Sequence, residues 1–131
     1  MDVKKWISEY PYLQAEAESL YIALEKLLPD GSASLESQNH ELTAKLHEIL
    51  DRRDSISKAI DSLKDPLDRC ILRERYIHTS TARLTPWREI AKRIRGNDAE
   101  KDIRYISRRH KIALEHLQVI AMKGLSGVDY M

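Results

Sequence analysis

The sequence is poor in residues that interrupt helices and in residues that crosslink chains. Its 131 residues include no phenylalanine, one cysteine, four glycines and four prolines. A single cysteine cannot form an internal disulfide, so a disulfide-bonded scaffold is excluded. No apolar run approaches the roughly 18 to 20 residues that cross a bilayer, and the N-terminal stretch MDVKKWISEYPYL lacks the apolar segment of a secretory signal. We therefore expect a cytoplasmic protein without a membrane partner.

The sequence also lacks the motifs of common enzymes and of metal sites. It has no glycine-rich phosphate loop, no nucleophile elbow and no pair of histidines with the spacing of a zinc site. We therefore expect no catalytic activity, no metal, no cofactor and no small-molecule substrate. Cys70 lies among apolar neighbours in DRCIL and is predicted to be buried without a chemical role. His40 and His47 are predicted to lie on the surface, and His110 in the core.

What the sequence has in quantity is charge and apolar residues that suit helices. Apolar residues make up 42% of the chain and charged residues 33%, a composition typical of helical, water-soluble proteins. The length is near the commonest size of a single domain and suffices to bury a core. We therefore predict an all-α fold, with an antiparallel helical hairpin in residues 1–64 and a second helical unit in residues 65–131.

The hairpin is predicted from two apolar seams on either side of a glycine- and serine-containing loop at residues 29–38. Steps of four and three keep each seam on one helix face. Arg53 is the one polar seam residue, and its stem can lie along the seam while its head reaches water or a carboxylate. The hairpin can close within one chain or pair between chains. Its thin core predicts packing against the second half or against another copy, and we expect a homodimer. The seams consist of Leu13, Ala17, Leu20, Leu24 and Leu27, then Leu42, Leu46, Ile49, Arg53, Ile56, Ile60 and Leu63.

Charge is divided unequally between the two halves of the chain. Residues 1–65 contain 8 Lys+Arg and 13 Asp+Glu, whereas residues 66–131 contain 14 and 8. The basic excess is concentrated in residues 83–111, which hold 10 basic and 4 acidic residues. A local excess of this kind marks the second half as the part that would contact an anionic polymer.

Two short helices are predicted in the second half before a long one. Asp65 and Pro66 have the chemistry of an N-cap and first helical residue, and Thr85 and Pro86 repeat the pair. The first helix, residues 66–77, is predicted to bury Leu67, Cys70, Ile71, Leu72 and Tyr76. The segment 78–84 is predicted to be a loop. The second helix has apolar residues at Trp87, Ile90, Ala91 and Ile94, and Gly96 ends it.

The long helix combines an apolar stripe with a basic one. Ile103, Ile106, Ala113, Leu117 and Ile120 form the apolar stripe, and His110 fills its missing step. Arginines on the opposite side can pair with guanine edges in the DNA major groove, and lysines can contact phosphates. The basic stripe is Lys101, Arg104, Arg108 and Lys111, flanked by Tyr105 and Ser107. The preceding helix would approach the phosphates with Thr85, Trp87, Arg88 and Lys92, although Trp87 also suits a core anchor.

Three segments together resemble a known group of regulators. LDRCILRERYI, LTPWREIAKRI and YISRRHKIALEHL are similar to successive parts of the helix-turn-helix in region 4 of bacterial sigma factors. They resemble still more closely the phage-encoded transcriptional regulators of the ArpU and RinA type. The resemblance covers roughly residues 66–117. It implies a regulator of phage or prophage genes in a bacterial host that binds double-stranded DNA and touches RNA polymerase.

The turn before the basic helix departs from this pattern. RGNDAEKD adds about five residues to the tight turn that helix-turn-helix motifs generally prefer. Either the turn is widened, or the basic helix starts early with Asn97 or Asp98 as its cap. The alternative function is a coiled-coil adaptor or antirepressor whose basic helix binds an acidic protein or RNA polymerase, because charge alone does not identify its partner.

Overall fold

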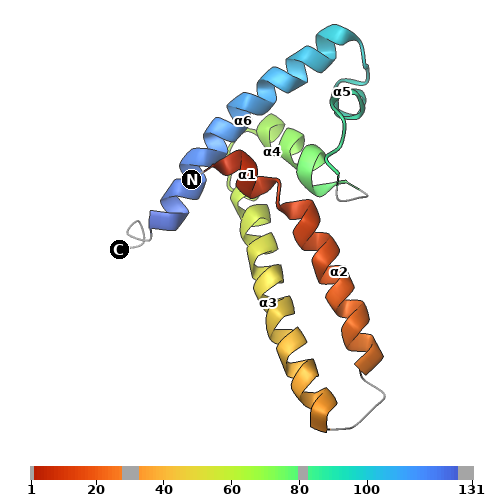
Figure 1. The fold of residues 1–131 in the computed structure, drawn as a ribbon. Coiled ribbons are helices and arrows are strands. Elements are labelled where there is room, and N and C mark those ends of the chain that lie inside the picture. The colour runs from red at the N-terminus through yellow and green to blue at the C-terminus, as the bar shows by residue number, and fades with distance from the viewer. Residues whose placement is uncertain (1, 28–32, 80–82, 127–131) are drawn as a thin grey trace.

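The computed structural model describes residues 2–27, 33–79 and 83–126 (Figure 1). All regular structure in these ranges is helical, which confirms the predicted all-α fold. Within the same ranges, no helix has the length and apolar character of a membrane span, and no group of side chains could hold a metal ion. The helices are α1 (Val3–Ile7), α2 (Tyr10–Leu27), α3 (Ala33–Asp61), α4 (Pro66–Leu72), a π-helical turn η1 (Arg73–Ile77), α5 (Trp87–Arg95) and α6 (Glu100–Ser126).

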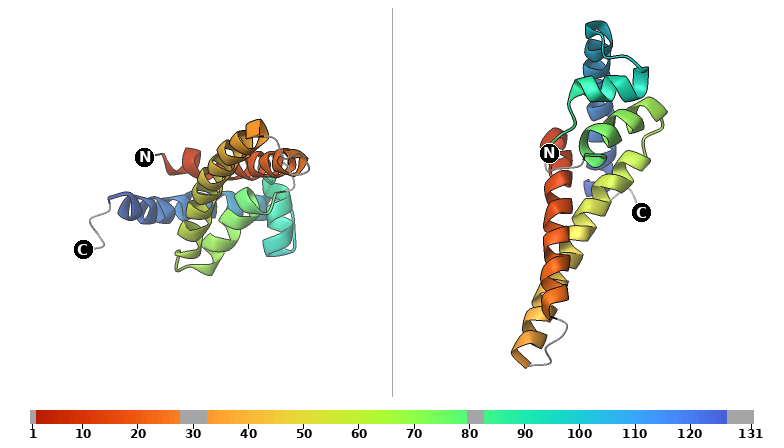
Figure 2. Two further views of the ribbon diagram at one scale, coloured as in Figure 1. Left: turned by 90° about the horizontal axis from the view of Figure 1, so that it is seen from below. Right: turned by 90° about the vertical axis from the view of Figure 1, so that its right-hand side faces the viewer.

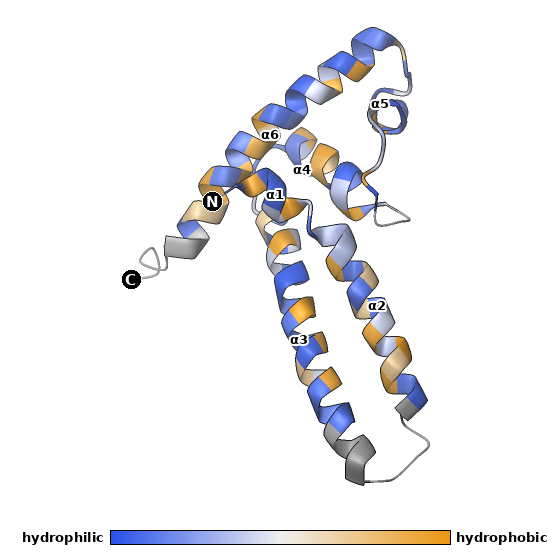
Figure 3. Cartoon of the chain, in the orientation of Figure 1, coloured by the Kyte–Doolittle hydropathy of each residue, from blue (hydrophilic) through white to orange (hydrophobic). Residues whose placement is uncertain are grey.

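Helices α2 and α3 form the predicted hairpin within one chain. They run antiparallel and project away from the rest of the molecule (Figures 1 and 2). Apolar residues lie on the facing sides of the two helices (Figure 3). Residues 29–32 of the predicted loop lie outside the described residues, and α3 already begins at Ala33, so the loop prediction was too long. The buried seam residues are Leu13, Ala17 and Leu20 on α2 and Leu46, Ile49, Ile56 and Ile60 on α3.

Arg53 occupies its seam position as predicted. Its Nη1 donates a hydrogen bond to Oε1 of Gln14 on α2 at 2.8 Å, and its Nη2 lies 3.1 Å from the carboxylate of Asp54. The arginine stem therefore fills the seam while the guanidinium group is satisfied by polar partners.

A short helix that the sequence analysis did not identify joins the two halves. In α1, Val3 and Ile7 are buried, and Asp2 caps the helix by accepting a hydrogen bond from the backbone of Lys5. The backbone N–H of Val3 donates to Oε1 of Gln118 on α6 at 3.3 Å. Apolar residues of α1, the hairpin, η1 and α6 belong to one buried cluster. The predicted division at residues 64 and 65 falls in the turn between α3 and α4, and this core crosses it.

Helix α4 and η1 bury most of the residues predicted for them, with an exception at Cys70. Ile71 and Leu72 are fully buried, as is Tyr76 in η1, but Cys70 is exposed. The prediction that Cys70 is buried was therefore wrong, because the helix turns Asp68 into the interior in its place. The chain continues into the wider π-helical turn, in which the N–H of His78 donates to the carbonyl of Arg73 at 2.7 Å.

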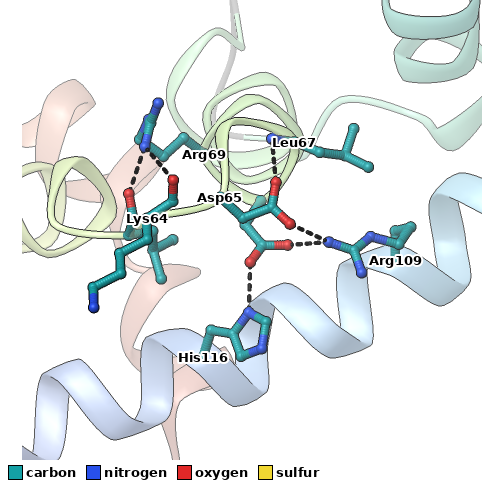
Figure 4. Close-up of polar contacts among 8 residues, drawn as sticks. Lys64, Asp65, Leu67, Arg69, Arg109 and His116 are labelled. Carbon is teal, nitrogen blue, oxygen red and sulfur yellow. Dashed lines mark hydrogen bonds and ion pairs between the residues drawn. The ribbon is translucent and has the colours of Figure 1, made fainter.

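The buried Asp68 is the centre of a polar network that fixes α4 on α6. Its Oδ1 accepts a hydrogen bond from Nη2 of Arg109 at 2.7 Å, and its Oδ2 lies 2.5 Å from Nδ1 of His116 (Figure 4). Arg109 also reaches Asp65, at 2.9 Å. Asp65 caps α4 as predicted, because its Oδ1 accepts the N–H of Leu67, and this bond lowers the pKa of its carboxyl group. A buried carboxylate with these partners is electrostatically satisfied.

Candidate nucleic-acid interface

Helices α5 and α6 form a compact helix-turn-helix. Gly96 ends α5 in the left-handed conformation, at φ 72°, and its N–H donates to the carbonyl of Lys92. Oδ1 of Asn97 then accepts the N–H of Ala99 at 2.8 Å, and α6 begins at Glu100. Only residues 96–99 lie between the helices, so the turn is short and Lys101 lies in the first turn of α6. Of the two alternatives, the structure shows the early start of the basic helix, because residues 100–102 belong to α6.

A second apolar cluster holds this unit together, separate from the core of the hairpin. Ile90 and Ala91 of α5 are fully buried against Ile106 of α6 and Ile71 of α4. Trp87, Ile94 and Ile103 are partly buried at its edge. The predicted apolar face of α5 is therefore the face that docks on α4 and α6. Its other face is left exposed.

Thr85 does not take the place predicted for it. Thr85 is only 4% exposed. Helix α5 starts at Trp87 with Pro86 as the N-cap, and no side chain forms a capping hydrogen bond there. The Thr85 backbone is held by Arg75, whose Nη1 donates to the Thr85 carbonyl at 2.6 Å while the Thr85 N–H donates to the Arg75 carbonyl. The prediction of a Thr85 N-cap was wrong, and burial excludes Thr85 from the surface of this unit.

Trp87 is a half-buried anchor between α5 and the rest of the molecule. Its ring meets His110 edge to face, with ring centroids 4.7 Å apart, and the guanidinium of Arg75 lies 4.1 Å from the ring centroid. His110 lies in the core as predicted, and its Nε2 is 2.7 Å from the hydroxyl of Tyr76. Burial, together with the smaller effect of the nearby positive charges of Arg75 and Lys4, lowers the pKa of His110 to about 4.

The predicted basic stripe is exposed along one side of α6. Its four side chains, Lys101, Arg104, Arg108 and Lys111, all face solvent. Arg104 forms an ion pair with Glu100 one turn earlier on the helix. Among the residues that the structure describes, the other three members form no salt bridge. Most of the stripe is therefore available to an anionic partner.

The exposed face of α5 adds further basic residues to the same unit. Arg88 is exposed in the first turn, and Lys92 is exposed with its Nζ 3.7 Å from the carboxylate of Asp98. Arg95 was not among the predicted site residues. In the structure its guanidinium lies 4.5 Å from the ring centroid of Tyr105 and 3.2 Å from the carboxylate of Asp102. Tyr105 is half-buried. Its ring and the buried Asp102 hold the end of α5 against the start of α6.

A shallow hollow lies between the start of α5 and the basic side of α6. It is lined by Trp87, Ile103, Arg104, Ser107 and Arg108. Four of these were predicted to contact DNA, and the structure brings them together. Ile103 was assigned only to the apolar stripe, because the spacing along α6 does not reveal that Trp87 approaches it from another helix. The hollow therefore combines apolar walls with two arginines.

Comparisons with known proteins gave no match: no family model, no curated protein and no solved structure matches this chain. The resemblance to phage regulators stays a prediction.

Proposed function

We propose that the protein is a sequence-specific regulator of transcription that binds double-stranded DNA with α6 in the major groove. The supporting observation is the exposed basic stripe on the second helix of a unit whose two helices are joined by a four-residue turn. The resemblance noted above extends the proposal to phage or prophage genes in the cytoplasm of a bacterial host. The proposed function requires neither a cofactor nor a metal.

The charges of α5 and α6 suggest a division of roles. Arg108 has no acidic partner in the described structure, and Arg104 is paired only with the exposed Glu100, so both can turn toward base edges. Lys101 and Lys111 lie toward either end of the stripe, where the phosphate backbones flank the groove. Arg88 and Lys92 on α5 would contact phosphates beside them. Trp87 would hold α5 in place, and Tyr105 and Ser107 would lie at the edge of the contact.

We expect removal of the arginines to reduce the affinity and base preference for a selected site, and removal of the lysines to reduce the affinity for DNA of any sequence. Arg104→Ala and Arg108→Ala should each weaken binding to a selected DNA site by about 1 to 3 kcal/mol and relax its base preference. Lys101→Ala and Lys111→Ala should weaken binding to every sequence alike and reduce the slope of log affinity against log salt by about one unit each. Titrations of the selected site and a scrambled duplex at several salt concentrations measure both effects.

The control is Arg52→Ala, which removes an exposed arginine from α3, distant in the chain from the proposed interface. It should leave DNA binding unchanged. If all four stripe variants bound both duplexes like the parent, the assignment of α6 would be wrong. The stripe would then be better explained if the protein were an adaptor or antirepressor that uses it to bind an acidic protein or RNA polymerase.

We further propose that the protein forms a homodimer, through a surface other than the one the seams suggested. The hairpin seams face each other within the chain and are buried there. In contrast, Val119 and Met122 are exposed toward the C-terminal end of α6, beyond the basic stripe. Antiparallel pairing of two α6 helices about a two-fold axis at Val119 would bring these exposed apolar residues of the two copies together.

Sedimentation equilibrium at micromolar concentration tests this dimer. The parent should be dimeric, and Val119→Glu should be monomeric because it places two like charges next to the symmetry axis. Tyr12→Glu is the matched change at an exposed position of α2 and should remain dimeric. A monomeric parent, with and without DNA, would overturn the dimer. Loss of the dimer in Tyr12→Glu alone would place the interface on the hairpin instead.

A further inference from the structure

The hollow between α5 and α6 is suited to a small apolar group on an otherwise polar, anionic partner. Trp87 and Ile103 supply apolar side chains to its lining, and Arg104, Ser107 and Arg108 complete it. Ser107 has a small side chain, and the lining is mostly apolar. Water in such a hollow has few hydrogen-bonding partners, so an apolar group that displaces it gains affinity.

We propose that this hollow receives the 5-methyl group of a thymine, and so makes a thymine next to the arginine-contacted bases part of the recognised site. This inference rests on the proposed binding of DNA by α6. The thymine methyl is the one apolar group that a base pair presents in the major groove. Arg104 and Arg108 would anchor the neighbouring base edges and phosphates, which would bring the methyl to the hollow.

The combination of lining residues favours this group over a phosphate or a sugar. A phosphate would pair with the charged ends of Arg104 and Arg108 and would leave the apolar surfaces of Trp87 and Ile103 uncovered. A methyl group loses no hydrogen bonds in the same environment. Contact with Ser107 would remain possible for either partner, so the apolar walls decide.

Replacement of thymine by deoxyuridine tests the proposal, because it removes only the methyl group. A site is first selected from a random DNA pool, and each thymine in it is then replaced singly. One thymine per half-site should lose about four-fold in affinity, which corresponds to about 0.8 kcal/mol for a buried methyl group. Replacement at the remaining thymines serves as the control and should leave the affinity unchanged.

The variant Ser107→Leu provides a second measurement, because its side chain would fill the hollow. This variant should bind the thymine and deoxyuridine duplexes equally, whereas the matched change Ser55→Leu, at an exposed position of α3, should keep the parent's four-fold difference. Specific binding that is insensitive to every deoxyuridine would overturn the thymine contact and leave the proposed function intact. Failure of the selection to yield any bound sequence would instead overturn the proposed function, and the thymine contact with it.

Discussion

Ile90→Asp is expected to destabilise the protein more than any other single change considered for it. Ile90 is fully buried between α5, α4 and α6, and it carries the contact that keeps α5 in place. Aspartate there would lose the apolar contacts and bury a charge without a partner. We expect the free energy of unfolding to fall by at least about 4 kcal/mol, measured by chemical denaturation followed by circular dichroism.

Two further variants show whether this loss comes from burial. Ile90→Val keeps the apolar character and should cost about 1 kcal/mol. Arg88→Ala lies two residues earlier on the exposed side and should change stability by no more than about 0.5 kcal/mol. Parent-like stability of Ile90→Asp would mean that α5 is not packed as described.

The hairpin and α5 could be predicted because their apolar residues follow a simple helical period. Leu13, Ala17 and Leu20 are buried, as is Ile90, each at the position its spacing indicated. Gly96 could also be assigned from its type, since the end of α5 requires a positive φ that glycine adopts without strain. These features depend on residues close together in the chain, which is why the sequence was sufficient.

The errors come from contacts between residues far apart in the chain. Asp68 is buried, and Cys70 exposed, because Arg109 and His116 of α6 compensate the Asp68 carboxylate. Nothing in residues 65–77 indicates those partners, and by type alone cysteine is the better candidate for burial. Thr85 was misplaced for the same reason, since Arg75 holds its backbone in the interior.

The candidate interface, too, could be predicted only where it depends on residues close together in the chain. The spacing of Lys101, Arg104, Arg108 and Lys111 was sufficient to predict one exposed face. The hollow beside that face could not be predicted, because it needs Trp87 of α5 to lie next to Ile103 of α6. The start of α6 at Glu100 was ambiguous in the sequence. In the structure the Asn97 side chain accepts a hydrogen bond from the N–H of Ala99 within the turn, and α6 begins at the next residue.

His110 is surrounded by residues from both halves of the molecule, and its lowered pKa makes the stability of the protein depend on pH. The side chain belongs to α6, accompanied by Tyr76 of η1 and Trp87 of α5, and the charges of Arg75 and Lys4 act on it. Burial and these two positive charges favour the neutral imidazole. In the unfolded chain the same group has its ordinary pKa of 6.5. The unfolded state therefore binds a proton that the folded state does not bind until the pH approaches about 4.

Acidification is accordingly expected to destabilise the parent through His110. The contribution of His110 to the free energy of unfolding is complete above pH 6.5 and is lost as the pH falls toward 4. Between pH 7 and pH 4.5 this loss should amount to about 2 to 3 kcal/mol. His110→Gln retains a partner for the Tyr76 hydroxyl but does not titrate, and its unfolding free energy should fall by that much less over the same interval. His47→Gln, at an exposed position of α3, is the matched control and should follow the parent. Denaturation curves at the two pH values give the difference for each protein. Equal pH dependence of the parent and His110→Gln would show that this imidazole is not held neutral by the fold.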